Sequence, residues 1–187
     1  MTHFPRFLAA AGILAAGTAT ASAKVERSVE KSFLVNPGVH LRVATSGGEI
    51  RVDPSAGNVV RVVAREHVRA SSEADADLVL QNLDLVIEQR GNDVVATASY
   101  RGDGNFHFGS WPPVEVDFIV TVPASASVDL KTSGGDIAVG DLEGTVLAHT
   151  SGGEIKLGRI GGEVEASTSG GNVDLALGSA RVRLSTS

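Results

Sequence analysis

The chain has 187 residues, no Cys, a formal net charge of −6 and only 4% aromatic residues. This length suits one domain, and its core must be mainly aliphatic. Without Cys there are no disulfides, thiolate metal sites or Cys nucleophiles. Acidic and basic residues are interspersed, so no basic stripe is present to neutralise phosphates, which argues against a nucleic-acid partner.

Residues 1–23 have the pattern of a signal peptide. A short start containing Arg6 precedes the apolar run 7–16, and Ala21-Ser22-Ala23 follows as a small-x-small cleavage site. The apolar run is shorter than the roughly 20 residues that a membrane span needs, which disfavours an anchor. We therefore expect cleavage before Lys24. Residues 24–187 would then be exported, to the periplasm, the cell surface or the medium, as one β-repeat domain without a transmembrane segment.

Alternating apolar residues and turn signals predict strands at 25–35, 39–43, 58–68, 83–88, 94–99 and 114–122. Only 71–82 is typical of a helix, because Ser72 is a candidate N-cap and Glu73, Asp75 and Asp77 suit the positive end of a helix dipole. The strands at 83–88 and 94–99 form a predicted hairpin. Residues 65–122 are thus expected to hold a helix and hairpin, as an insertion or a cap.

A hexapeptide recurs four times: TSGGEI at Thr45–Ile50, TSGGDI at Thr132–Ile137, TSGGEI at Thr150–Ile155 and TSGGNV at Thr168–Val173. The last three copies begin 18 residues apart, and Thr186-Ser187 falls on the same step.

Each 18-residue unit holds two short alternating stretches separated by glycine corners, which predicts one coil of a β-solenoid or β-roll over residues 123–187. Stacked coils would bury ladders such as Ile137, Ile155 and Val173. An antiparallel meander, with each repeat a hairpin, is the alternative.

Two further features follow from the coil hypothesis. The serines at the corners (Ser133, Ser151, Ser169) are expected to hydrogen-bond across coils. The last coil would leave an open sheet edge. Either the natural chain continues beyond Ser187, or this edge is a docking surface, for example for end-to-end self-association.

A second duplication spans a larger distance. Phe33, Pro37 and Thr45 recur as Phe118, Pro123 and Thr132, at offsets of 85 to 87 residues. The same strand-turn-strand unit is therefore expected to lead into the repeat twice.

The signal peptide, the TSGG-[DEN]-[IV] repeats, the S-x-E-A-D helix and the V-x-V-P strand together resemble the bacterial putative-adhesin β-strand-repeat family, domain of unknown function 4097. The resemblance covers roughly Lys24 to Ser187. It implies a β-solenoid domain at the cell envelope or surface, and it supplies no catalytic residues.

The loop 100–113 is the candidate ligand or partner contact, because it carries most of the aromatic residues of the exported part: Tyr100, Phe106, Phe108 and Trp111. Exposed aromatics can stack on sugars or anchor a protein partner. The alternative is a plug that closes the end of the solenoid.

No catalytic, cofactor or metal site is predicted. A calcium ladder on Asp136 and Glu154 lacks the third glycine and the correctly placed Asp of the β-roll motif. We therefore expect an exported, non-catalytic β-solenoid domain that binds or scaffolds at the envelope, with an unknown envelope protein or glycan as partner. The alternatives are a polysaccharide-acting β-solenoid enzyme and an envelope-stress sensing or regulatory partner.

The face assignment of the repeat can be tested by substitution. Ile155→Asp should cost several kcal/mol of stability because it buries an unpaired charge, whereas Glu154→Lys should cost little. Thermal melts of the two variants measure this difference, and equal losses would contradict the assignment.

Overall fold

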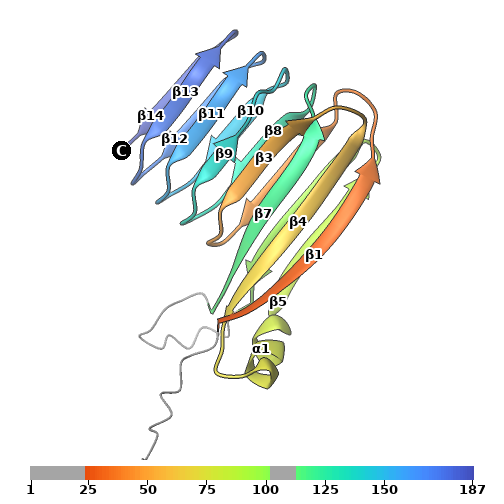
Figure 1. The fold of residues 1–187 in the computed structure, drawn as a ribbon. Helices are drawn as coiled ribbons and strands as arrows, with labels where there is room; N and C mark the ends of the chain where they lie inside the picture. Colours follow the sequence, from red (N-terminus) through yellow and green to blue (C-terminus); the bar gives the residue numbers. More distant parts are fainter. Residues whose placement is uncertain (1–23, 102–112) are drawn as a thin grey trace, which may run out of the picture.

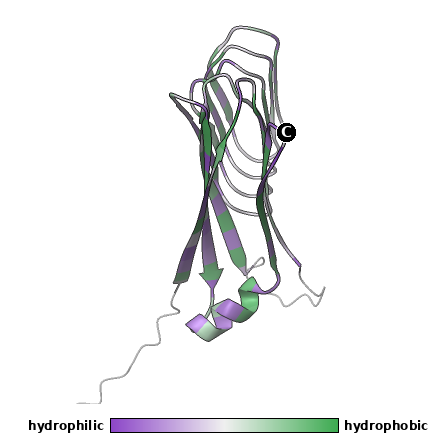
Figure 2. Cartoon of the chain, turned by 90° about the vertical axis from the view of Figure 1, so that its right-hand side faces the viewer, coloured by the Kyte–Doolittle hydropathy of each residue, from purple (hydrophilic) through white to green (hydrophobic). Residues whose placement is uncertain are grey.

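The computed structural model describes residues 24–101 and 113–187 and is all-β, with one short helix (Figure 1). Its strands form two seven-stranded sheets of mixed direction, which are not closed into a barrel. Turned by 90°, the molecule shows two layers joined by nested loops at one end, with the helix at the other (Figure 2). The predicted all-β class is confirmed.

In sheet A the strands lie side by side in the order β1 (Lys24–Leu34), β4 (Val59–Arg69), β7 (Val114–Pro123), β3 (Ile50–Ser55), β9 (Ile137–Val139), β11 (Ile155–Ile160) and β13 (Val173–Gly178). In sheet B the order is β14 (Val182–Thr186), β12 (Val164–Thr168), β10 (Val146–His149), β8 (Ser127–Lys131), β2 (His40–Thr45), β6 (Asp93–Tyr100) and β5 (Leu83–Arg90).

The 18-residue repeats stack in parallel and in register. Ile155 pairs with Ile137 on one side and with Val173 on the other. The two strands of each repeat lie in different sheets, so the antiparallel meander is wrong. Ile137 and Ile155 are almost completely buried, at 1% and 0% exposure, as the predicted ladder requires.

The first hexapeptide copy joins the same stack although 87 residues separate it from the second. Ile50 pairs with Ile137, and β2 pairs with β8 in the other sheet. The larger duplication therefore has a structural meaning, because its two copies lead into neighbouring levels of the stack.

Strands β6 and β7 form a further level of the stack that the hexapeptide does not mark. β6 pairs in parallel with β2, and β7 pairs in parallel with β3. Phe118 of β7 lies beside Ile50 and is fully buried. In the sequence this level comes after β2 and β3. In the stack it lies on the side of β2 and β3 that faces away from the regular repeats.

The helix α1 (Glu73–Leu80) begins where it was predicted. The Ser72 hydroxyl accepts a hydrogen bond from the Asp75 N–H at 3.1 Å, as an N-cap should. Ala76 is buried against the sheets. The acidic first turn also binds Arg27 of β1, whose guanidinium lies 3.3 Å from Glu73.

Side chains bridge β1 and β5, the two edge strands at this end of the molecule. Lys31 Nζ donates to the Ile87 carbonyl at 2.9 Å, and Gln89 Nε2 donates to the Leu34 carbonyl at 2.9 Å. These bonds occupy edge carbonyls that would otherwise invite another strand.

Threonine hydroxyls connect successive levels of the stack. Each first-position threonine donates to a backbone carbonyl of the preceding level at 2.8–3.0 Å. The pairs are Thr45 with Val116, Thr132 with Gly48, Thr150 with Gly135, Thr168 with Gly153 and Thr186 with Gly171. The neighbouring corner serines, for which this role was also predicted, are exposed.

The second glycine of each hexapeptide is required by backbone contact between levels. A Cβ added at Gly48, Gly135, Gly153 or Gly171 would lie only 1.9–2.2 Å from a carbonyl oxygen of the preceding level. A Cβ at the first glycine has room, since its nearest neighbour at Gly152 is 3.7 Å away. The two glycines therefore have different roles.

We expect Gly153→Ala to destabilise the domain by about 1–3 kcal/mol, because the added methyl forces the stacked backbones apart. Gly152→Ala is the matched control and should be neutral or slightly stabilising, since alanine restricts the unfolded chain. Urea unfolding curves of both variants measure the difference, and similar midpoints would show that close approach does not explain the second glycine.

Candidate functional site

The predicted aromatic site falls mostly outside the described residues. Phe106, Phe108 and Trp111 lie there. Tyr100 is at the end of β6, half-buried and packed against the hydrophobic core. The aromatic contact site therefore stays a prediction, and the described surface offers two other candidates, one on the outer face of each sheet.

The first candidate is a hollow of about 270 Å³ on the outer face of sheet B, here called the sheet B groove. Its outward-facing side chains come from β8, β10 and β12 and are Asp129, Lys131, Leu147, His149, Glu165 and Ser167. Parallel pairing puts Leu147 between Asp129 and Glu165, and His149 between Lys131 and Ser167. Two rows of side chains thus cross the strands.

Leu147 is an outward-facing residue of this groove, with 39% of its surface exposed. His149 Nδ1 is hydrogen-bonded to Ser167 Oγ at 2.8 Å beside it. An apolar centre among hydrogen-bonding groups can hold a ligand that is itself partly apolar and partly polar.

The His149–Ser167 contact alone does not make a nucleophile. An activated serine needs a base oriented by a third group and donors for the developing oxyanion. The pair lies on exposed strands, and the recorded contact uses the Nδ1 atom of the histidine. The arrangement therefore supports binding better than acyl transfer.

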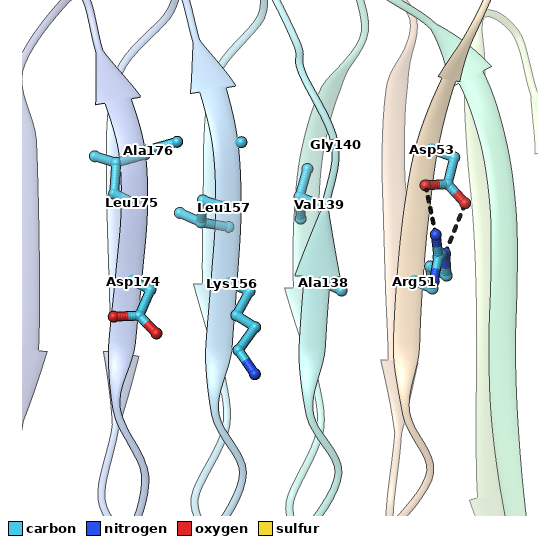
Figure 3. Close-up of a pocket in the computed structure, with 11 residues that line it drawn as sticks. Arg51, Asp53, Ala138, Val139, Gly140, Lys156, Leu157, Asp174, Leu175 and Ala176 are labelled. Atoms are coloured by element: carbon cyan, nitrogen blue, oxygen red, sulfur yellow. Dashed lines mark hydrogen bonds and ion pairs between the residues drawn. The ribbon is translucent and has the colours of Figure 1, made fainter.

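The second candidate is a hollow of about 500 Å³ on the outer face of sheet A, here called the sheet A trough (Figure 3). Its outward-facing residues form two rows across β3, β9, β11 and β13. The lower row in the figure is Arg51, Ala138, Lys156 and Asp174. The upper row in the figure is Asp53, Gly140 and Ala176. Gly158 belongs to the same row, because its neighbour Leu157 pairs with Val139 and Leu175. The middle of the trough therefore consists mainly of very small side chains.

Carboxylates beside the trough keep its two cations, Arg51 and Lys156, protonated. The Asp53 carboxylate accepts from Arg51 Nε at 2.8 Å and raises the pKa of that guanidinium. The Glu154 carboxylate, 2.8 Å from Lys156 Nζ, raises the pKa of the lysine. Neither cation is poised to release a proton near neutral pH, so these residues are binding groups rather than acid–base catalysts.

The described residues contain no group of three or more His, Asp or Glu side chains placed to hold a metal ion. Asp136, part of the rejected calcium ladder, accepts a hydrogen bond from the Glu154 N–H at 2.8 Å. Asp117 accepts from the Glu49 N–H at 2.8 Å in the same way one level earlier. Asp136 and Asp117 thus each bind a backbone amide of the next level.

Glu66 is a buried carboxyl that the sequence did not single out. It lies on the inward face of β4, opposite Arg27 of β1, and is only 7% exposed. Loss of hydration raises its pKa, and the charge of Arg27 partly opposes that shift. A raised carboxyl pKa is a signal of function only where a cleft exposes the group, and Glu66 lines none of the described pockets.

No protein-family model matches the chain, and no curated protein matches it. Several solved structures are similar in shape. A putative cell adhesion protein from Clostridium sporogenes has 8% identity and a TM-score of 0.45, and the match covers 86% of this chain and 99% of that one. A putative adhesin from Bacteroides fragilis has 12% identity and a TM-score of 0.29, with 86% and 97% covered.

A putative lipid binding protein from Parabacteroides distasonis has 11% identity and a TM-score of 0.41, over 85% of this chain and 62% of that one. The chain thus spans less than two thirds of this last neighbour. Identities and TM-scores this low do not transfer a neighbour's role to this chain. Separately, the helix in the described part is too short to cross a membrane.

Glu66→Gln should stabilise the domain at pH 7 by a few degrees in melting temperature. Because the folded pKa is raised, the folding free energy is most favourable below the ordinary Glu pKa and weakens as pH rises through the folded value. The gain should therefore vanish near pH 4. Glu30→Gln is the control of opposite sign, since Arg61 lowers the pKa of Glu30. A gain for Glu66→Gln that is equal at pH 4 and pH 7 would contradict this explanation.

Proposed function

We propose that this chain is an exported, non-catalytic β-solenoid module of the bacterial cell envelope that binds or scaffolds an envelope glycan or protein. The signal-peptide pattern before Lys24 supports export. The TSGG repeats support membership of the putative-adhesin β-strand-repeat family. Parallel coils in register support a rigid surface on which spaced side chains keep fixed positions.

The observation that carries this proposal is the sheet B groove around Leu147. Leu147 keeps 39% of its surface in water, and a ligand that covers this apolar surface would gain hydrophobic free energy. Lys131 and His149 supply donors and Asp129 and Glu165 supply acceptors around it. Hydroxyl-rich sugars with apolar ring faces combine both needs, so an envelope glycan is the first ligand to test.

The alternative enzyme on polysaccharide needs a paired acid and base across a scissile bond. The groove has two carboxylates, Asp129 and Glu165, on either side of Leu147. Asp129 is only 7% exposed and its carboxylate is ion-paired with Arg42 at 3.2 Å, so it is not open to a glycosidic oxygen as a general acid must be. Binding without cleavage is therefore the better reading of this surface.

Leu147→Asp should abolish or weaken glycan binding at least tenfold without unfolding the domain, since the side chain is already partly exposed. Leu78→Asp is the matched control, because Leu78 is also an exposed leucine, at 60%, but lies on α1. The measurement is calorimetric titration of residues 24–187 with envelope polysaccharide fragments, followed by pull-downs from envelope extract. No binding by the parent chain, or equal binding by both variants, would refute this role of the groove.

A further inference from the structure

We propose that the sheet A trough is a self-association surface, through which two copies of this chain pack face to face about a two-fold axis. The inference concerns the opposite sheet from the sheet B groove and does not depend on glycan binding. It rests on the order of charges and small residues along the two rows of the trough.

The lower row is fixed by strand register. Arg51 is the Cα partner of Ala138, Ala138 of Lys156, and Lys156 of Asp174. The row therefore begins with a cation at β3 and ends with an anion at β13, as Figure 3 shows. Neighbouring strands lie about 4.8 Å apart. The two ends are thus about 14 Å apart and cannot pair within one copy.

A two-fold axis parallel to the strands, between β9 and β11, makes this row complementary to itself. The axis places β3 of each copy opposite β13 of the other. Arg51 then faces Asp174 of the second copy, and the symmetry repeats the pair at the other end of the row. A closed two-fold contact of this kind uses the same patch on both copies.

The charges at the two ends can form these pairs. Among the described residues, Asp174 makes no ion pair within 4 Å. Its neighbour Lys156 is already bound to Glu154. Arg51 holds Asp53 through Nε and one terminal nitrogen, and a guanidinium has five N–H donors. One Arg51 can therefore hold Asp53 and an Asp174 of the second copy together.

The upper row makes close approach feasible. The same axis places Gly140 opposite Gly158 of the second copy, so these two positions contribute no side chain to the contact. In the lower row the longer Lys156 meets only Ala138 of the second copy. Aligned sheets pack about 10 Å apart when ordinary side chains fill the space. At the trough, the small residues of the upper row let two facing sheets approach more closely than this. A patch of four short strands is smaller than a standard interface, so the dimer should be weak.

The test is sedimentation velocity of residues 24–187 over a wide range of concentrations, at low and moderate salt. The parent chain should show a monomer–dimer equilibrium that weakens with salt. Asp174→Arg and Arg51→Asp should each weaken association at least about tenfold, because each places like charges opposite one another. The double variant Arg51→Asp/Asp174→Arg should recover it to within about threefold, because the two charges are exchanged.

Ala138→Trp is a second variant that changes no charge. Its bulky side chain would occupy the trough and prevent the second copy from approaching, so it should also abolish the dimer. Leu147→Asp, on the other sheet, should leave association unchanged. Melting curves of every variant show whether it is folded. A monomer at all concentrations, or a folded double variant that fails to recover, would overturn the proposal. Open-ended assembly unaffected by these variants would point to the β13–β14 edge and would also overturn it. None of these results bears on glycan binding at the sheet B groove.

Discussion

The close approach of backbones at the second glycine of each hexapeptide is the constraint on which the stack depends. At Gly153 there is no room for even one methyl group against the carbonyl of Gly135. The Thr150 hydroxyl binds that same carbonyl at 2.9 Å. Sterics thus set the separation between levels, and a buried hydrogen bond fixes which residue meets which. A slip of register would lose both, and it would also leave a buried hydroxyl unpaired.

This constraint explains why the residues repeated in every level differ from the residues proposed to bind partners. Thr150, Gly153 and Ile155 are buried and serve the stacking. The outward positions beside them, such as Lys156 and Leu147, are free to vary between levels because neither packing nor backbone pairing depends on them. The identical register of every level then turns that variation into ordered rows. We therefore propose binding and self-association on these rows of outward-facing side chains. The TSGG hexapeptide itself maintains the stacking of the levels.

Sequence alone predicted the parts of the fold that local pattern dictates. The buried column through Ile155, the Ser72 cap and the hairpin at Gly91 follow from apolar period and turn chemistry. The level formed by β6 and β7 could not be found in this way, because it has no TSGG and stacks out of sequence order. The one sign of this level in the sequence was Phe118, which the larger duplication matches with Phe33. The groove at Leu147 was also missed, since an exposed leucine becomes a site only when neighbouring strands bring polar groups beside it.

The out-of-order level gives the N-terminal half a distinct physical role. β3 is paired with β7 on one side and β9 on the other, so the first hexapeptide is enclosed before the regular repeats begin. β1 and β4 extend sheet A beyond β7, and side-chain bonds from Lys31 and Gln89 tie that edge to β5. At this end, the stack is therefore covered by irregular strands, whose edges are joined by the Lys31 and Gln89 hydrogen bonds. The regular repeats do not depend on such side-chain bonds, because each repeat presents the next with the same glycine, threonine and apolar positions. The irregular half thus covers this end of the stack, while the repeats fix their own register through the glycine and threonine contacts.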